Sequence, residues 1–338
     1  MRIAIASGKG GTGKTTIAVN LALSLVEPEP VQFIDCDVEE PNAHIFLKPR
    51  IEQVRSVEKL LPEVDEELCN HCGQCAKACE FNAIAVIGKK VLVYNDLCHG
   101  CGLCKMVCPT GAISEVPHEL GVIESGTARG FPFAQGLLNV GEAMATPIIH
   151  ALKDDIDQQY LTIIDAPPGT GCPTIAALHG ADVALLVTEP TPFGLHDLKA
   201  AVGVARSLEV PIAVVINRNG IGDDRVERYC EQEGLPIPLR IPFDREIAVL
   251  YSEGTPLVDA LPAWKERFIH LYHEIISQGG EGATSVASGF MPDGLNKRCT
   301  PVCFVDATGR QGATLRAAED VPAVDIGPNE GPKKGEAG

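Results

Sequence analysis

Two groups of residues in this chain of 338 residues have types and spacings that could do chemistry. The first is the segment 7–16, which reads SGKGGTGKTT. A glycine-rich turn between a strand and a helix directs backbone N–H groups toward one point, where the helix N-terminus favours negative charge. Lys14 can then reach the β- and γ-phosphates of a nucleotide, and the Thr15 hydroxyl can bind Mg²⁺. The expected phosphate ligands are Gly8, Gly10, Gly11, Thr12, Gly13, Lys14, Thr15 and Thr16.

The second group consists of eight cysteines, arranged as one four-cysteine repeat that occurs twice. The chain has 13 cysteines, and its start has no apolar secretory segment because Gly8 and Lys9 interrupt it. Metal ligation is therefore favoured over disulfides, and two zinc sites with four ligands each are numerically allowed. The repeats read Cys69-x2-Cys72-x2-Cys75-x3-Cys79 and Cys98-x2-Cys101-x2-Cys104-x3-Cys108.

Short apolar runs that alternate with helical patterns must position both groups. Ile3–Ala6 reads as a strand before the glycine-rich loop, and Ile17–Val26 has helical spacing after it. Near-continuous apolar strands, each followed by a helical pattern, are typical of a parallel sheet covered on both faces. We therefore expect an α/β fold with a doubly wound, mostly parallel sheet. The further strands expected are Val31–Asp35, Tyr160–Ile164, Val183–Thr188 and Pro211–Asn217.

Four weaker patterns complete the expected elements. Gly121–Glu124 reads as a strand, and Gly126–Gln135, which contains Arg129, reads as a glycine-rich loop. Asn139–Lys153 and Trp264–Ile276 both read as amphipathic helices.

Acidic side chains follow two of the expected strands. Asp35 and Asp37 come at the end of one strand, and Asp165 comes at the end of another. Carboxylates at strand ends beside a phosphate loop can meet Mg²⁺ or the attacking water. A polar turn capped by Asp and Asn is the alternative for the segment 35–42, and a simple turn is the alternative for 167–171, which reads PPGTG.

The net charge of −17 disfavours two classes of partner. Phosphate neutralisation on nucleic acids needs clustered Lys and Arg, and attachment to an anionic membrane surface needs the same. No apolar stretch approaches the roughly 20 residues that cross a bilayer. We therefore expect a cytoplasmic protein that binds neither nucleic acid nor membrane.

The loop at 7–16 resembles the deviant Walker A motif of the MinD, Mrp and nitrogenase iron-protein class of ATPases. The resemblance depends on Lys9, a second lysine inside the loop, for which a solvated side chain is the alternative. It implies ATP hydrolysis in a nucleotide-sandwich homodimer, where Lys9 acts on the phosphates bound by the partner subunit and Lys14 acts in its own subunit. It also implies that Asp37 orients the attacking water and that Thr15, Asp35 and Asp165 lie at the Mg²⁺.

The same resemblance extends to residues farther along the chain. The segment 167–171 resembles the switch II of Mrp-type ATPases, in which glycine amides such as that of Gly169 approach the γ-phosphate. Asn217 resembles the asparagine that contacts the adenine base in this class, and Pro242 would line the base pocket. A cap of a helix or turn is the alternative for Asn217.

The segment 62–117 resembles a bacterial two-cluster ferredoxin, because the repeated spacing is followed by FNAI in one copy and by PTGAI in the other. The resemblance implies two [4Fe–4S] clusters, each with three ligands from one repeat and one from the other. Glu80 replaces the proline that usually follows the first repeat, and His71 and His99 are expected to be loop residues. The implied ligand sets are Cys69, Cys72, Cys75 and Cys108 for one cluster, and Cys98, Cys101, Cys104 and Cys79 for the other.

The domains expected are a discontinuous ATPase domain at 1–61 and 118–278, a ferredoxin domain at 62–117, and a flexible tail at 279–338. Cys299-x3-Cys303 lies in the tail, where labile cluster binding and two stray cysteines are the alternatives. Three further cysteines are expected to be buried small residues: Cys36, Cys172 and Cys230. A redox role for Cys172 is the alternative.

Three functions are consistent with these motifs. An ATP-dependent electron-transfer protein is favoured, because the eight cysteines form a complete ligand set for two clusters. An iron–sulfur cluster carrier is the alternative, and it would depend on Cys299 and Cys303. A MinD-like spatial organiser usually ends in a basic amphipathic helix, which the acidic tail does not offer. An amidotransferase would need a glutaminase-like nucleophile motif, which is absent.

Overall fold

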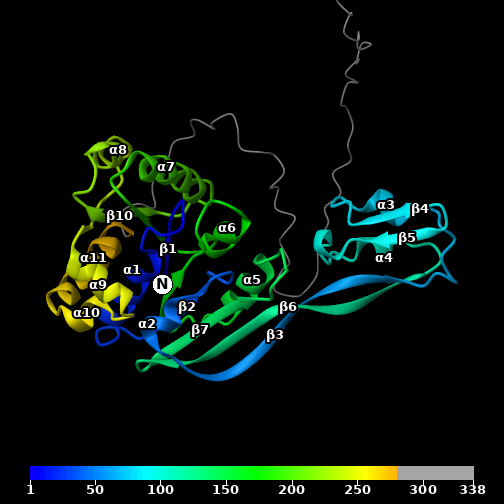
Figure 1. Ribbon diagram of the computed structural model, residues 1–338, viewed down its shortest axis with the longest axis horizontal. Coiled ribbons are helices and arrows are strands. Elements are labelled where there is room, and N and C mark those ends of the chain that lie inside the picture. Colours follow the sequence, from blue (N-terminus) through cyan, green and yellow to red (C-terminus); the bar gives the residue numbers. More distant parts are fainter. Residues whose placement is uncertain (280–338) are drawn as a thin grey trace, which may run out of the picture. The chain divides into compact units, whose positions relative to one another are not determined.

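The computed structural model of the protein describes residues 1–279 (Figure 1). The expected flexible tail, with Cys299 and Cys303, lies outside the described residues apart from Gly279. Gly279 is the last residue of a helix. Among the helices of the described part of the chain, none is both long enough and apolar enough to cross a membrane.

A nine-stranded sheet forms the centre of the fold, and the expectation of a doubly wound, mostly parallel sheet is confirmed. Only the last two pairs of neighbouring strands in the sheet, β7 with β6 and β6 with β3, are antiparallel. The strands are, in order across the sheet, β11 (Leu239–Pro242), β10 (Ile212–Asn219), β9 (Val183–Thr188), β1 (Arg2–Ala6), β8 (Leu161–Asp165), β2 (Val31–Asp35), β7 (Phe131–Leu138), β6 (Ile113–Ala128) and β3 (Arg50–Val64).

Helices cover both faces of this sheet. Strand β1 is continuously apolar because both of its faces are buried. Ile3 and Ile5 belong to one hydrophobic core, and Ala4 and Ala6 belong to the other. The first core includes side chains of α1 (Lys14–Leu25), α2 (Ala43–Leu47), α9 (Arg245–Ser252), α10 (Leu257–Ala260) and α11 (Ala263–Gly279). The second includes side chains of α5 (Thr146–Asp154), α6 (Cys172–Leu178), α7 (Pro192–Ser207) and α8 (Arg225–Glu233).

Strands β3 and β6 pair over most of their length, and the cysteine repeats lie between them in the sequence. One end of this pair lies in the central sheet beside β7, whereas the other end packs against the cysteine-containing segment. The predicted domain limits, Pro62 and Pro117, therefore fall inside β3 and β6. The segment between them contains α3 (Gln74–Ala78), the hairpin β4 (Ile84–Ile87) and β5 (Lys90–Val93), the 3-10 helix η1 (Asn95–Leu97) and α4 (Leu103–Met106).

Two predicted elements are wrong in this region. Gly126–Gln135 is not a loop, because β6 and β7 form a hairpin there. Its two-residue turn consists of Arg129 (φ 51°) and Gly130 (φ 91°). Positive φ angles at both positions are typical of a tight two-residue hairpin turn. The helix expected from residue 139 begins only at Thr146, since a loop follows β7.

Candidate functional site

The glycine-rich loop joins β1 to α1, as predicted. Gly13 has a φ of +92°, and a Cβ placed there would lie 2.4 Å from Asn217 Nδ2. The Asn217 amide donates a 2.8 Å hydrogen bond to the Thr12 carbonyl, so the end of β10 holds the loop from the side. A Cβ at position 13 would collide with the Asn217 side chain, so the turn requires glycine here, and a glycine-rich turn before a helix N-terminus is suited to bind phosphate oxygens.

Thr15 and Asp165 meet beside this loop. The Thr15 hydroxyl donates a 2.5 Å hydrogen bond to Asp165 Oδ2. Asp165 is fully buried, and its Oδ1 atom has no hydrogen-bond partner among the described residues. Burial raises the pKa of Asp165, although the Lys14 ammonium lowers it. A buried, unpartnered carboxylate oxygen beside a hydroxyl is a donor set that suits a hard cation such as Mg²⁺.

Lys14 and Asp37 face each other, with 3.7 Å between Lys14 Nζ and Asp37 Oδ2. Both side chains are buried. Burial raises the pKa of Asp37 to about 6, although the charge of Lys14 lowers it. The structure therefore brings four predicted residues together at the carboxyl ends of β2 and β8: Lys14, Thr15, Asp37 and Asp165.

Asp35 has a defined position in the same region. Its carboxylate accepts hydrogen bonds from the backbone N–H groups of Asp37 (3.0 Å), Asn42 (3.2 Å) and Ala43 (3.1 Å). Burial raises the pKa of Asp35, and the charge of Asp165, its register partner on β8, raises it further. Asp35 therefore holds the segment after β2 in place, and its role near a metal stays a prediction.

Sequence reasoning missed two residues of the site, Glu189 and Arg218. Glu189 follows β9, and its buried carboxylate lies 2.5 Å from Arg218 Nη1. Its other oxygen lies 3.5 Å from Lys9 Nζ. An acidic residue at the carboxyl end of β9 was the available signal. The ion pair with Glu189 holds the half-exposed Lys9 side chain against its own chain, so this side chain is not fully solvated.

The remaining predicted nucleotide residues lie at neighbouring strand ends. Gly169 has a φ of +93°, and its N–H donates a 2.9 Å hydrogen bond to the Ser7 carbonyl, which joins the segment after β8 to the glycine-rich loop. Pro242 ends β11 and is the register partner of Asn219 on β10. The base contacts of Asn217 and Pro242 stay predictions.

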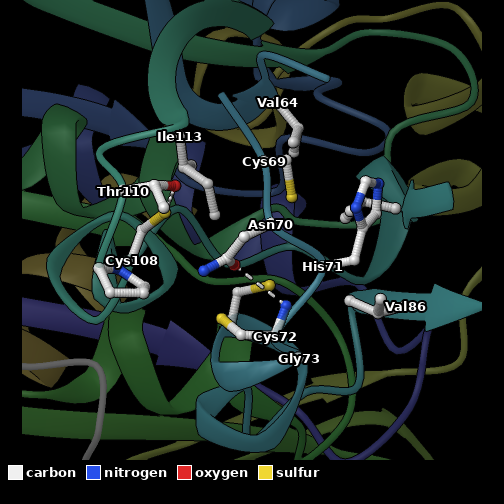
Figure 2. A pocket seen from close by; sticks show the side chains of 13 residues that line it. Val64, Cys69, Asn70, His71, Cys72, Gly73, Val86, Cys108, Thr110 and Ile113 are labelled. Atoms are coloured by element: carbon white, nitrogen blue, oxygen red, sulfur yellow. Dashed lines mark hydrogen bonds between the residues drawn. The ribbon is translucent and has the colours of Figure 1, made fainter. Parts of the chain in front are cut away.

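One pocket of the cysteine-containing segment is shown in Figure 2. The Cys69 and Cys108 side chains lie on different sides of its hollow, and the empty space there, open solvent included, is about 320 Å³. The Asn70 side chain accepts a hydrogen bond from the Cys72 backbone, and the Cys108 thiol pairs with the Thr110 hydroxyl at 3.7 Å. The cysteines that line this pocket are Cys69, Cys72, Cys75 and Cys108.

A second pocket, with about 430 Å³ of empty space including open solvent, is lined by the other four cysteines of the repeats. Backbone N–H groups of Ala83 and Gly100 point at the Cys79 and Cys98 sulfurs, at 3.3 Å and 3.5 Å. The rings of Phe81 and His99 stack beside them with centroids 3.6 Å apart. The cysteines that line this pocket are Cys79, Cys98, Cys101 and Cys104.

Each pocket thus combines three cysteines of one repeat with the last cysteine of the other. The division matches the ligand sets that the ferredoxin resemblance implies. Within residues 1–279, no group of three or more His, Cys, Asp or Glu side chains gathers closely enough to hold a single metal ion. The sulfurs surround a hollow rather than one point, and this donor set fits a polynuclear iron–sulfur group.

The three cysteines outside the repeats differ from one another. Cys36 and Cys230 are fully buried, as predicted. Burial raises the pKa of the Cys36 thiol, and it raises the pKa of Cys230 to about 11. The prediction that Cys172 is buried is wrong, because this residue begins α6 at the surface.

The chain is similar to several known proteins. The family model described as the CobQ/CobB/MinD/ParA nucleotide binding domain matches residues 3–257. An uncharacterized protein of Methanocaldococcus jannaschii is 33% identical over 278 residues, which cover 81% of this chain and 96% of that protein. A protein of Pyrococcus horikoshii, named iron-sulfur cluster carrier protein, is 28% identical over 306 residues, which cover 83% of this chain and 89% of that one.

The fold is similar to that of a solved structure, the septum site-determining protein MinD of Pyrococcus horikoshii complexed with Mg-ADP. The TM-score is 0.51 at 21% identity, and the match covers 82% of this chain and 97% of that one. At this identity the likeness concerns the fold alone.

Proposed function

Because the chain belongs to the CobQ/CobB/MinD/ParA family of nucleotide-binding domains, we propose that it hydrolyses ATP and couples the bound nucleotide to electron transfer through two [4Fe–4S] clusters. The observation that carries this proposal is the division of eight cysteines between two pockets, beside a family domain with an intact phosphate loop. The nucleotide and the clusters would then be held by one polypeptide.

The hydrolysis proposed is an in-line attack of water on the γ-phosphate. Asp37 would orient the water, and Lys14 would stabilise the charge that develops on the phosphate oxygens. Thr15 and Asp165 would hold Mg²⁺, which is supported by their mutual contact and by Asp165 Oδ1, an atom with no hydrogen-bond partner within residues 1–279. Lys9 of a second copy would complete the site, so we propose a homodimer with nucleotide at the interface.

The eight pocket cysteines would hold the clusters through their thiolates. When bound, such clusters supply one-electron storage at potentials set by charge, solvent exposure and hydrogen bonds to the sulfurs. This chain contributes N–H groups aimed at the Cys79 and Cys98 sulfurs and an aromatic stack of Phe81 and His99 at the second pocket. These contacts would set the environment of one cluster differently from that of the other.

The order of elements supports the coupling. Strand β3 leaves the nucleotide-binding fold after Asp37, and β6 returns to it before Asp165. A change in the segments after β2 or β8 on hydrolysis can therefore reach the cluster-binding segment through continuous backbone. Moving a one-electron potential by about 100 mV needs about 2.3 kcal/mol, which is within the range of allosteric coupling energies.

Redox titration of the anaerobically prepared protein tests the proposal. We expect the midpoint potential of at least one cluster to differ between the ADP complex and the complex with a non-hydrolysable ATP analogue. Identical potentials in both complexes, together with full cluster and nucleotide occupancy, would rule out the coupling.

A cluster carrier is the second candidate, and it is favoured by the relatives named iron-sulfur cluster carrier protein. In that case the protein would transfer a cluster to an apo-acceptor, and Cys299 and Cys303 would be needed. Transfer assays with the wild type and with a variant carrying Cys299→Ser and Cys303→Ser separate the candidates. Transfer that the variant loses would favour the carrier, whereas stable retention of both clusters would favour electron transfer.

A further inference from the structure

The pair of strands β3 and β6 carries a buried polar cluster between the nucleotide-binding fold and the second cysteine pocket. On one face of β3, alternate side chains have three different surroundings. Val57 belongs to a hydrophobic core of the central fold, and Leu61 packs with Ala83 and Cys98 at the pocket. Lys59 lies between them in the strand and is only 8% exposed. A buried lysine needs partners, so its contacts define what this junction holds together.

Lys59 has partners from both sides of the junction. Its ammonium donates a 3.0 Å hydrogen bond to the Asn95 carbonyl, and its Nζ lies 3.8 Å from Glu142 Oε2. The other oxygen of Glu142 lies 2.7 Å from Nε2 of His118, the register partner of Lys59 on β6. The sulfur of Met144 lies 4.0 Å from the same ammonium. Glu142 and Met144 belong to the loop between β7 and α5, whereas Asn95 belongs to the cysteine-containing segment.

The Asn95 carbonyl is also part of the second cysteine pocket. It accepts a 3.2 Å hydrogen bond from the Cys98 N–H, so one oxygen serves both the lysine and the first cysteine of the repeat. The following loop rests on the same strand, since a Cβ at Gly100 would lie 3.1 Å from the Leu60 carbonyl and 3.5 Å from the Lys59 Cβ. The position of Cys98 is therefore linked to that of Lys59.

At its other end, the Glu142 loop is linked to the segment that contains Asp37. The Leu138 N–H, at the end of β7, donates a 2.8 Å hydrogen bond to the Val38 carbonyl. Strand β7 and Val38 are closely packed, because a Cβ at Gly136 would lie 2.6 Å from Val38 Cγ1. The Glu142 N–H then bonds the Asn139 carbonyl at 3.1 Å. A displacement of Asp37 and Val38 would therefore move the loop that holds Glu142.

We infer that Glu142 and Lys59 are positioning residues that transmit the nucleotide state from the Asp37 segment to the cluster pocket of Cys98. This inference rests on the proposed function and adds the path by which the nucleotide site and the cluster are coupled. It also names the cluster that responds, which is the one held by the pocket of Cys79, Cys98, Cys101 and Cys104. Among the described residues, no hydrogen bond or ion pair joins Lys59 or Glu142 to the pocket of Cys69, so its cluster should respond less.

The test uses the full-length, anaerobically reconstituted protein and the variant Glu142→Gln, which keeps the shape of the side chain but removes its charge. Glu58→Gln is the matched control, because Glu58 is the exposed neighbour of Lys59 in β3 and points to the opposite face of the strand. Three quantities are measured with ADP and with a non-hydrolysable ATP analogue. They are the electron paramagnetic resonance spectrum of the reduced clusters, the analogue affinity of oxidised and reduced protein, and amide hydrogen exchange in residues 95–98.

In the wild type and in Glu58→Gln, we expect an analogue affinity that differs by about fivefold or more between oxidised and reduced protein, as linkage requires for coupled sites. We also expect a nucleotide-dependent spectrum for one cluster and altered exchange at 95–98. In Glu142→Gln these differences should disappear while both clusters and ATP binding are retained.

Differences that persist unchanged in Glu142→Gln would overturn the route and leave the proposed function standing. A wild type that binds both clusters and nucleotide without any difference would overturn the route and the proposed coupling together. If Glu142→Gln loses its clusters, Lys59→Gln serves as the second variant, and retention of the wild-type differences there would equally overturn the route.

Discussion

The Thr15 hydroxyl and the Asp165 carboxylate are joined by a hydrogen bond although 150 residues separate them in the sequence. The contact places the end of β8 at the start of α1 and leaves Asp165 Oδ1 without a partner among the described residues. We expect Asp165→Asn to lower Mg²⁺-dependent ATP hydrolysis by about 100-fold or more, because a neutral amide holds the cation poorly. Steady-state phosphate release at varied Mg²⁺ concentration measures the effect.

Asp154→Asn is the control for this variant, since it removes the same charge at an exposed position near the end of α5. It should hydrolyse ATP at the wild-type rate. Wild-type activity and wild-type Mg²⁺ dependence in Asp165→Asn would show that the metal is held elsewhere.

Lys9 gives a second prediction. In the single chain its ammonium is held 3.5 Å from Glu189, whereas the proposed mechanism needs it at the phosphates of a partner subunit. We expect Lys9→Ala to bind ADP normally but to lose most ATP hydrolysis, because the charge on the phosphate oxygens would lack one cation. Phosphate release, and the molar mass in solution with an ATP analogue, are the measurements. Lys89→Ala, at an exposed turn, should behave as the wild type. Unchanged hydrolysis in Lys9→Ala would contradict a role in the partner's site.

A third prediction concerns the backbone of the phosphate loop. Gly13→Ala should lower the free energy of unfolding by about 1–2 kcal/mol, because a Cβ is disfavoured at a φ of +92°. It should also displace the Asn217 amide, which lies 2.4 Å from the added atom. Gly10→Ala is the control, since a Cβ there has no neighbour within 4 Å and its φ is not in the left-handed range. Denaturant unfolding of both variants measures the difference, and equal stabilities would contradict the loop geometry.

A fourth prediction concerns cysteine reactivity. Burial raises the pKa of Cys230 from 9.0 to about 11. The thiolate form of cysteine is the nucleophile. At pH 8 the fraction of Cys230 in the thiolate form should be about 100-fold lower than for an ordinary cysteine, and this fraction should increase as the pH approaches 11. Iodoacetamide labelling of the native protein, followed by peptide mass analysis, should modify the exposed Cys172 and spare Cys230. Labelling in guanidinium should modify both. Equal rates in the native protein would show that Cys230 is accessible.

Much of the nucleotide site could be predicted from the sequence, because its residues follow strongly apolar strands. Lys14, Asp37 and Asp165 lie together since the carboxyl ends of parallel strands meet at one edge of the sheet. Glu189 was missed although it also follows such a strand, because a single acidic residue outside a motif gives no signal of its partners Lys9 and Arg218.

The strands β3 and β6 could not be predicted well. Most side chains of β3 are exposed, and most of those of β6 are partly or fully exposed, so the apolar pattern of both strands is weak. The alternation of Val57, Lys59 and Leu61 was a usable signal, but it contains a buried lysine that reads as a surface residue. The contact of Glu142 with Lys59 joins parts of the chain that are distant in sequence, and only the structure brings them together.

We propose that one chain holds a nucleotide site and two four-cysteine cluster sites, and iron and sulfide counts on anaerobically prepared protein test this most directly. We expect about eight irons and eight sulfides per chain, since each cubane holds four of each. Replacing Cys69 and Cys108 by serine, which removes two ligands of one pocket, should leave about four irons. Replacing Cys69 and Cys79, which belong to one repeat but line different pockets, should impair both clusters.

The wild type should also bind ATP in the same preparation. Zinc in place of iron, or a loss of only one cluster when Cys69 and Cys79 are replaced together, would contradict the division of ligands between the pockets. A preparation that contains no iron and binds no ATP would contradict the account as a whole.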